Sequence, residues 1–475
     1  MLEQLAAIVG KTNVLTGAET DPWISDISGM LSGSAVAVVR PGSVDEVAQI
    51  VRLAAALRLP VIPLGGRTGL TGGGIGDNAL VVSLERMAAI REIRPEAQVA
   101  VVEAGVILAD IHTAADRHDL IFPLMFGARG SARVGGFLGT NAGGSNVLRY
   151  GNARDLVLGI EAVLPNGEIV DLMSGLHKNN SGYDLRHLLI GSEGTLGIIT
   201  AAVLKLKPKP GAYATAMIGM QRLSDALPLL NEVQKATGGM LDAFEYMPDK
   251  YVGDYLTLGD RQGTPHRLPF DDRYPVNILL EIGALAPRDC APEETGEIPI
   301  VTYLEDLLGR YLEEGRIDDA VVARNEAQRQ EMWARREAAS EIAGLWPHRV
   351  TNDVAVPVDQ VEAFLTRADK TVQDVDPGAT TSVVAHLGDG NIHYTVFPTS
   401  GDAARKDRIM ERVEDIVSDM RGSFSAEHGI GTVKLSSMSR RKDPGALAAM
   451  RAIKQALDPL GIMNPGKLLP PEKRV

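Results

Sequence analysis

The stretch PLGGRTGLTGGGIGD, residues 63–77, decides the fold because its many glycines leave the backbone uncovered by side chains. Glycine permits positive φ, and successive N–H groups can then point at one anion. A P-loop would need Gly-Lys-Ser/Thr, which is absent, and a Rossmann loop would open a helix. The residues that follow, NALVVSL (78–84), instead predict a strand. The stretch therefore predicts a phosphate site on a strand–loop–strand connection.

Two further stretches within the first 210 residues are equally rich in glycine: GARGSARVGGFLGTNAGGSNVLRYG (127–151) and GSEGTLGIIT (191–200). The longer one is too rich in glycine for a helix core and too apolar for a disordered linker. Each stretch alone could be a set of tight turns. Three of them in one region favour a large, flat ligand that lies along exposed backbone.

The overall composition limits the classes of function. A chain of 475 residues exceeds one hydrophobic core, and its net charge of −13 argues against nucleic acid or an anionic membrane as partner. The single cysteine, Cys290, excludes a disulfide framework and a cysteine zinc site. We see no signal peptide and no apolar run of about 18 residues. We expect a cytoplasmic protein, with peripheral attachment to the inner face of a membrane left open.

Periodicity predicts the elements around the glycine stretches. Ser43 and Glu46 form a capping pattern before a helix, and the turn Pro165-Asn166-Gly167 predicts a hairpin over 155–172. Strands are expected at 35–39, 60–64, 79–84 and 98–105, and long helices at about 318–343, 359–374, 402–420 and 445–457. The expected domains are 1–210, 211–455 and an irregular tail, 456–475.

The stretch HLGDGNIH, residues 386–393, places two histidines around a turn. On a straight strand His386 and His393 would face opposite ways, but the glycines at the turn let both imidazoles converge. Glu427, in SAEHG (425–429), can supply a third ligand to a divalent metal and leave a position open for substrate. The alternative is a pair of surface or hydrogen-bonded histidines. Asp389 is either a hydrogen-bond acceptor behind a histidine or a turn-forming residue.

The glycine stretches, in this order, resemble the flavin-binding half of the vanillyl-alcohol oxidase / p-cresol methylhydroxylase (PCMH) superfamily. HLGDGNIH, SAEHGIG and NPGK (464–467) narrow the resemblance to the FAD-linked D-2-hydroxyacid dehydrogenases, over nearly the whole chain. That branch includes D-lactate and D-2-hydroxyglutarate dehydrogenases and the flavin subunit of glycolate oxidase. The resemblance implies an α+β fold: a PCMH-type FAD-binding domain of two subdomains and an α+β substrate (cap) domain. The implied reaction oxidises a D-2-hydroxyacid to the 2-oxoacid, with the hydride passing to flavin N5.

The resemblance also implies a set of FAD-binding residues. Members that tether the flavin often carry a histidine in the first glycine loop; this loop has none, so we expect non-covalent FAD. The residues expected to bind FAD are Pro63, Gly65, Gly66, Arg67, Thr68, Gly69, Ser131, Gly135, Gly136, Thr140, Asn141, Gly143, Gly144, Gly151, Glu193, Gly197, Ile199 and Asn464.

The same resemblance places a divalent metal on His386, His393 and Glu427, with Zn²⁺ expected first and Mn²⁺ left open. His428 beside Glu427 could take the hydroxyl proton, since imidazole has a pKa of about 6.5. Alternatively, it could only orient the substrate.

Arginine suits the substrate carboxylate because its guanidinium binds two oxygens at once. Alignment with the family pattern favours Arg336 over Arg335, although either could be a solvated helix residue, and Ser340, Asn391 and Lys434 are further candidates for substrate contact. The chain departs from the hydroxyglutarate pattern at Ser340, where threonine is expected, and at Thr351, where lysine is expected. D-lactate, D-2-hydroxyglutarate, glycolate or a bulkier acid therefore remain open.

The partners expected are a small 2-hydroxyacid and an electron acceptor: an electron-transfer flavoprotein, a quinone or a cytochrome. Two alternatives are an oxidase that uses oxygen directly and a flavin subunit that works with an iron–sulfur protein. Because Cys290 is the only cysteine, any such cluster would lie on another chain. Assembly as a homodimer is left open.

Overall fold

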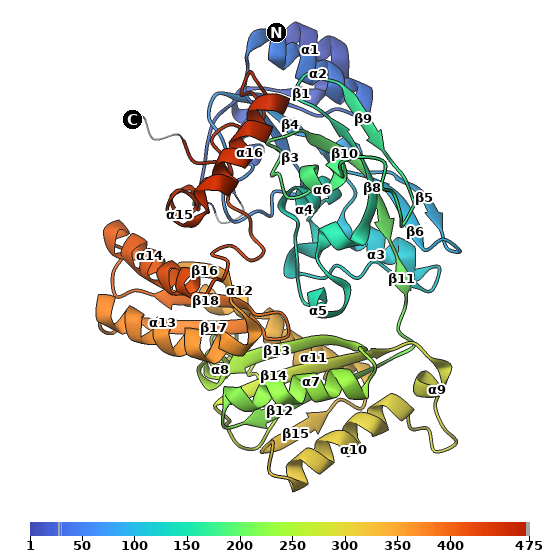
Figure 1. The fold of residues 1–475 in the computed structure, drawn as a ribbon, viewed down its shortest axis with the longest axis vertical. Coiled ribbons are helices and arrows are strands. Elements are labelled where there is room, and N and C mark those ends of the chain that lie inside the picture. Colours follow the sequence, from blue (N-terminus) through green and yellow to red (C-terminus); the bar gives the residue numbers. More distant parts are fainter. Residues whose placement is uncertain (27–28, 30, 472–475) are drawn as a thin grey trace. The chain divides into compact units, whose positions relative to one another are not determined.

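The computed structural model describes residues 1–475 except 27–28, 30 and 472–475. Its contacts define two compact units: residues 1–144, 151–208 and 427–475, and residues 145–150 and 209–426. The domain expected over 211–455 includes residues 427–455, which pack with the first unit. The last four residues of the expected tail lie outside the described part. Helices and sheets occur in both units, which confirms the α+β class (Figure 1).

The first unit begins with a four-stranded sheet of order β1-β2-β4-β3. Its strands are β1 (Val14–Leu15), β2 (Ala35–Val39), β3 (Val61–Leu64) and β4 (Ala79–Ser83), with helices α1 (Leu2–Val9) and α2 (Val44–Leu57). Strand β4 runs parallel to β2 and β3. As the capping pattern predicts, Ser43 Oγ accepts the Glu46 N–H at 3.2 Å. The first glycine stretch joins β3 to β4, as expected.

A second, antiparallel sheet of the same unit has the order β5-β6-β10-β8-β9. Its strands are β5 (Ile90–Arg94), β6 (Val99–Glu103), β8 (Val157–Val163), β9 (Ile169–Leu172) and β10 (Ile198–Lys205). The predicted hairpin is confirmed: Gly167, with φ 78°, turns the chain from β8 to β9, and its N–H reaches Leu164 O at 2.8 Å. The associated elements are α3 (Leu108–Asp116), α4 (Val134–Thr140), α6 (Leu185–Leu189), α15 (Leu435–Arg441), α16 (Pro444–Leu457) and a short pair, β7 (Leu120–Ile121) with β11 (Lys207–Pro208).

The expectation that the second glycine stretch is too rich in glycine for a helix is wrong, because its residues 134–140 form α4. Val134, Phe137 and Leu138 are buried on one side of this short helix, so tertiary packing outweighs the low helix propensity of its glycines. The helix ends at Asn141, which adopts the left-handed conformation at φ 54°.

The second unit is built on a seven-stranded antiparallel sheet of order β15-β12-β14-β13-β17-β18-β16. Its strands are β12 (Ala212–Met220), β13 (Leu241–Pro248), β14 (Val276–Ala284), β15 (Asp319–Val322), β16 (Val350–Ala355), β17 (Thr380–His386) and β18 (Asn391–Phe397). The short helix α5 (Val147–Tyr150) also belongs to this unit.

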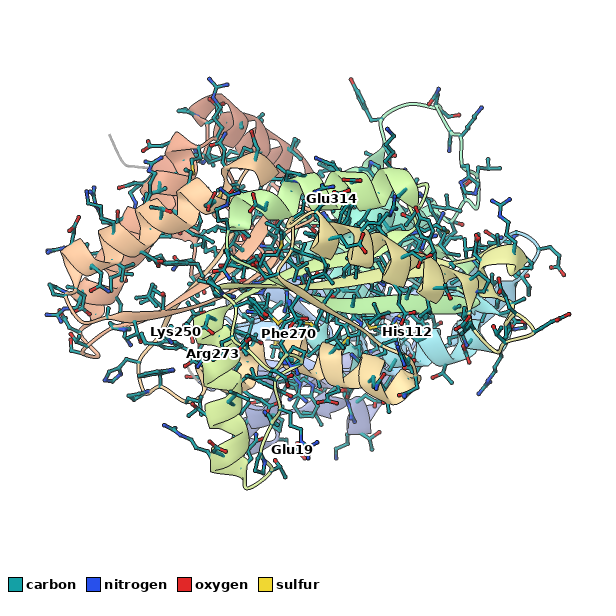
Figure 2. All side chains as sticks on the ribbon, turned by 90° about the horizontal axis from the view of Figure 1, so that it is seen from below. Glu19, His112, Lys250, Phe270, Arg273 and Glu314 are labelled. Carbon is teal, nitrogen blue, oxygen red and sulfur yellow. The ribbon has the colours of Figure 1, made fainter. Side chains whose placement is uncertain are left out.

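Helices cover both faces of this sheet. On one, the apolar face, Ile278, Ile392 and Tyr394 pack beneath α7 (Ala226–Ala236), α10 (Pro299–Glu313), α13 (Val361–Val375) and α14 (Ala403–Asp419). The other carries Met217 and Leu279 beneath α8 (Asp249–Gln262), α11 (Glu326–Glu337) and α12 (Ala339–Ala343). The segment after α8 also packs on this side through Phe270, which is labelled in Figure 2. The Phe270 ring stands edge-on to that of Tyr274, with centroids 5.2 Å apart. Helix α9 (Pro287–Cys290) lies between β14 and α10.

The expectation of one helix over 318–343 is wrong at its start. Asp319–Val322 forms β15, which pairs antiparallel with β12, and the helix begins only after Asn325. The Asn325 side chain accepts the Gln328 N–H at 3.0 Å and so caps α11. Within the described residues, no helix is both long and apolar enough to cross a membrane.

Phe364 tests the apolar face of the second unit. Its side chain is fully buried and meets Tyr394 edge-on, with ring centroids 5.8 Å apart. We expect Phe364→Ala to lower the free energy of unfolding by about 3–5 kcal/mol, because it leaves a cavity. Urea unfolding would measure the loss. Leu312→Ala, at a position 39% exposed on the same unit, should change stability far less; equal losses would contradict this account of the core.

Candidate active site

The first two glycine stretches touch each other through their backbones. A methyl group added at Gly66 would lie 2.1 Å from Ser131 O, and one at Gly65 would lie 2.9 Å from Gly136 N. Only glycine fits such an approach. The structure thus brings together the N–H-rich loop after β3 and the start of α4, which the sequence expected to bind one ligand.

The third glycine stretch and the segment near residue 464 join the same place. A methyl group at Gly194 would lie 2.9 Å from Pro63 Cγ. Asn464 Nδ2 donates to Gly73 O at 2.9 Å and to Glu193 O at 2.7 Å. The sequence expected this segment to return to the cofactor region, and the structure places it against two of the three glycine stretches.

Two other residues expected to bind FAD, Arg67 and Asn141, contact groups of the protein. Arg67, at φ 59°, donates to Pro22 O and lies over Trp23, with 5.7 Å from its guanidinium carbon to the ring centroid. Asn141 Oδ1 accepts the Arg154 N–H at 2.9 Å. Gly69 has open space where a side chain would be. The remaining expected residues lie on these same segments: Thr68, Gly135, Thr140, Gly143, Gly144, Gly151, Gly197 and Ile199.

The two histidines of HLGDGNIH do converge. In the register of β17 and β18, His386 lies opposite Asn391 and Val384 opposite His393, so both imidazoles stand on the same face of the sheet. Their ring centroids are 5.4 Å apart with the planes at 77°. The turn between them uses Gly390 at φ 80°, where a side chain would also strike Val356 O.

A buried carboxylate stands behind each histidine. Glu245 Oε1 lies 2.9 Å from His386 Nδ1, and Asp353 Oδ1 lies 3.9 Å from His393 Nδ1. Both acids are only 1% exposed. The contact of Glu245 is within hydrogen-bond distance and fixes the ring orientation of His386, whereas the 3.9 Å between Asp353 and His393 is too long for a hydrogen bond. The sequence analysis missed both acids, although each lies inside a strand, Glu245 in β13 together with Asp242, and Asp353 in β16, and a carboxylate within a strand is a detectable signal.

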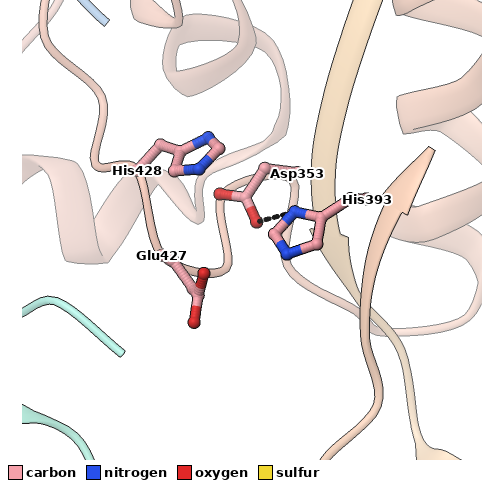
Figure 3. Close-up of side chains that lie close together, drawn as sticks. All are labelled: Asp353, His393, Glu427 and His428. Atoms are coloured by element: carbon pink, nitrogen blue, oxygen red, sulfur yellow. Dashed lines mark ion pairs between the residues drawn. The ribbon is translucent and has the colours of Figure 1, made fainter. Parts of the chain in front are cut away.

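Figure 3 draws four side chains of residue types that bind metal ions: Asp353 and His393 of the second unit, joined by the dashed line, and Glu427 and His428 of the first unit. Ala426 N–H bonds Asp353 O at 3.3 Å, so the chain reaches Glu427 directly from the edge of β16. A methyl group at Gly143 would lie 2.6 Å from Glu427 Oε1. The Glu427 carboxylate therefore lies against the second glycine stretch.

Of the residues predicted for the site, His393, Glu427 and His428 are among these four, and Asp353 was not predicted. The predicted ligand His386 is not among them, and Arg336 Nη2 lies 3.2 Å from its Nε2. Nitrogen and carboxylate oxygen are donors that suit Zn²⁺ or Mn²⁺. The donors present thus fit a divalent ion.

Neither candidate arginine is a solvated helix residue: Arg335 is 1% and Arg336 is 7% exposed. Arg336 Nε donates to Glu245 Oε2 at 2.6 Å. Glu245 therefore contacts Arg336 and His386 at once and couples the predicted substrate cation to a predicted metal ligand. Arg335 instead donates through Nη2 to Arg267 O at 2.9 Å.

Among the other predicted residues, Asp389 and Asn391 bond to neighbouring protein groups. Asp389 Oδ1 accepts the Asn391 N–H at 3.0 Å, which is the turn-forming alternative. Asn391 Nδ2 donates to Asp353 Oδ1 at 3.0 Å and so helps to hold that carboxylate. Ser340 lies in α12, and Lys434 is buried just before α15. Thr351 is exposed on β16, opposite Thr395.

Comparison with known proteins identifies the family. Residues 35–173 match the model of an FAD binding domain, and residues 293–468 match that of the C-terminal domain of FAD linked oxidases. D-2-hydroxyglutarate dehydrogenase of Xanthomonas citri pv. viticola is 36% identical, over 91% of this chain and 89% of that protein. That of Stutzerimonas stutzeri is 34% identical over 98% of both chains, and the mitochondrial enzyme of Bos taurus is 33% identical over 99% of this chain and 83% of that protein.

The chain belongs to the D-2-hydroxyglutarate dehydrogenase family. It is an FAD-dependent 2-hydroxyacid dehydrogenase, an oxidoreductase acting on a CH–OH group, as the resemblance implied. Solved structures agree on the fold. p-Cresol methylhydroxylase gives a TM-score of 0.74 at 15% identity over 99% of this chain and 96% of that chain, and alkyldihydroxyacetonephosphate synthase gives 0.73 at 17% identity over 98% and 85%. This chain thus has the PCMH-type fold.

Glu245 gives this site a pH-dependent contribution to stability. Burial alone would raise the pKa of Glu245, but His386 and Arg336 outweigh burial and hold the pKa below its ordinary value of 4.5. A carboxyl with a lowered folded pKa stabilises the protein above its unfolded pKa, and that contribution is lost as pH falls through the folded pKa.

We expect Glu245→Gln to lower the free energy of unfolding at pH 7 by about 3–5 kcal/mol, because Arg336 keeps a buried charge without its carboxylate. The difference from the natural protein should shrink as pH falls below 4.5. Urea unfolding at a series of pH values would measure it, with Glu341→Gln on the exposed side of α12 as control. A difference that grows towards low pH would contradict the assigned charge.

Proposed function

We propose that the chain oxidises a D-2-hydroxyacid to the 2-oxoacid with non-covalent FAD and a divalent metal. Two observations support this: in the second unit the imidazoles of His386 and His393 converge, each near a buried carboxylate, and in the first unit the Glu427 carboxylate lies against a glycine stretch. Bound FAD would supply the hydride acceptor, and a divalent ion would lower the pKa of the substrate hydroxyl. The glycine stretches around Gly66 and Ser131 would hold FAD without side chains in its way.

The proposed metal ligands are His386, His393 and Glu427, with Zn²⁺ preferred over Mn²⁺. Glu245 supports the choice of His386, since its contact with Nδ1 fixes the imidazole; Arg336 Nη2, 3.2 Å from Nε2, would have to move for an ion to bind there. Asp353 lies 3.9 Å from His393 Nδ1, and its Oδ1 also accepts from Asn391. A role behind His393 therefore explains its contacts better than a role as the third ligand.

His428 is proposed to take the hydroxyl proton. It follows Glu427 directly in the chain, so an ion held by Glu427 would bring a substrate oxygen near this imidazole. A neutral imidazole can accept a proton near physiological pH.

Arg336 is the proposed contact for the substrate carboxylate. Its pairing with Glu245 fixes the guanidinium beside His386, one of the proposed metal ligands. Ser340, Asn391 and Lys434 stay as weaker proposals for substrate contact.

The relatives are named for D-2-hydroxyglutarate, and we take that acid as the first substrate to test. Thr351 stands where the hydroxyglutarate pattern expects lysine, and a lost hydrogen bond to a charged group is worth about 1.5–3 kcal/mol. Anaerobic bleaching of the flavin by a panel of D- and L-2-hydroxyacids decides the substrate. Bleaching by D acids, with D-2-hydroxyglutarate compared against D-lactate and glycolate, supports the proposal; bleaching by none of them overturns it.

Removal of the metal should separate its role from that of FAD. Treatment with a chelator is expected to abolish turnover and leave FAD bound, because the glycine stretches that would hold FAD contain no proposed metal ligand. Activity and the flavin spectrum after gel filtration measure both, and Zn²⁺ or Mn²⁺ added back should restore turnover. Full activity in a preparation free of metal would remove the role given to His386, His393 and Glu427.

Replacement of the proposed base should affect the chemical step. We expect His428→Ala to slow anaerobic flavin reduction by about 10²–10⁴-fold, the usual contribution of general-base catalysis, with a smaller change in substrate affinity. Stopped-flow reduction over a range of substrate concentrations separates the two quantities. His177→Ala, at an exposed histidine, is the control. Equal losses in rate and affinity would recast His428 as a binding residue.

A further inference from the structure

Glu193 occupies an unusual backbone position between α6 and β10. It adopts φ 51°, a region that residues other than glycine seldom enter. Its N–H donates to Gly139 O at 2.8 Å, and its carbonyl accepts Asn464 Nδ2 at 2.7 Å. Backbone contacts on both sides thus keep Glu193 in a strained conformation that aims its side chain.

The Glu193 carboxylate binds the backbone of the segment that follows His428. Oε1 accepts the Ile430 N–H and Oε2 accepts the Gly431 N–H, each at 2.7 Å. Two consecutive N–H groups directed at one anion form a backbone nest, here filled by a side chain of the same protein. A methyl group at Gly429 would lie 2.9 Å from Oε1, so the segment approaches the carboxylate as closely as glycine allows.

Thr71, from the first glycine stretch, holds the same segment from another side. Its Oγ1 donates to His428 O at 3.1 Å, and its carbonyl accepts the Thr432 N–H at 2.9 Å. A methyl group at Gly431 would lie 2.0 Å from Thr71 O. The backbone from His428 to Thr432 is therefore clamped between Thr71 and Glu193.

We propose that Glu193 is a positioning residue for the segment Glu427–Gly431, rather than the FAD contact that the family resemblance implied. Both carboxylate oxygens are directed at the backbone of this segment. The inference rests on the proposed function of Glu427 and His428, because it assigns Glu193 the task of fixing where those two side chains stand. A misplacement of about 1 Å in such groups can cost about 10²-fold in rate.

Two variants test this role. Glu193→Gln keeps the shape but turns an amide N–H₂ towards a backbone N–H, so it cannot satisfy both donors. Glu193→Gly removes the carboxylate and suits the positive φ. The exposed Glu168→Gln is the control. For both Glu193 variants we expect hydrogen exchange to speed up at the amides of residues 430–431 and to stay unchanged at 65–77 and 135–144.

Binding and kinetics complete the test. Both Glu193 variants should bind FAD within about twofold of the natural protein, weaken Zn²⁺ binding, and reduce flavin by substrate about 10–100-fold more slowly with little change in KM. A second arm uses Gly429→Ala, which crowds Oε1: the double variant with Glu193→Gln should be no slower than the slower single variant.

Unchanged exchange at residues 430–431 would overturn the proposal, as would loss of FAD in parallel with activity. Exchange, FAD binding and Zn²⁺ binding do not depend on which acid is oxidised. If the natural protein fails to oxidise any D-2-hydroxyacid, these three measurements still decide the role of Glu193, so failure of this inference and failure of the proposed function can be told apart.

Discussion

The close approach of backbone to backbone is the constraint on which the FAD-binding unit depends. A β-carbon at Gly66 would lie 2.1 Å from Ser131 O, and one at Gly144 would lie 1.9 Å from Met125 O. These contacts join segments far apart in the chain, so the glycines are required by tertiary packing as well as by local turns. The first glycine stretch joins β3 to β4 and does not open a helix, so it is not a phosphate site of the helix-capped kind.

The second unit meets a different constraint, the burial of charge. Glu245 and Asp353 stand on a sheet face that also carries Met217 and Leu279, and a lone carboxylate there would be costly. Glu245 is paired with Arg336 and His386, and Asp353 lies beside His393 and Asn391. These pairings fix the positions of catalytic candidates before a ligand arrives, which is the arrangement that preorganised sites require.

Local signals in the sequence predicted local structure well. The Ser43 cap, the hairpin at Gly167 and the convergence of His386 with His393 follow from turn chemistry and strand periodicity, which act over a few residues. Family motifs supplied the FAD-binding unit and the enzyme class. The start of α11 was misjudged because the pairing of β15 with β12 overrides helical periodicity, and α4 because packing overrides glycine propensity.

The carboxylates behind the histidines could not be assigned from sequence, because their partners are distant along the chain. Glu245 lies 141 residues before His386 and 91 before Arg336, and only the sheet register brings them together. The same limit applies to Glu193, whose motif indicated cofactor binding, whereas its carboxylate reaches residues 237 and 238 positions later. Motifs specify which residues are near a site, and the fold decides what each one touches.

The make-up of the first unit also bears on biosynthesis. Val61 N–H bonds Ile462 O and Asn464 N–H bonds Val61 O, both at 2.8 Å, so residues 462–464 lie along β3 like an added strand. When the ribosome has synthesised the whole second unit, which ends at residue 426, it has not yet synthesised residues 462–464. Until translation passes residue 464, the edge of β3 lacks these pairings and the nascent chain carries an unfinished nucleotide-binding unit that chaperones or proteases can reach.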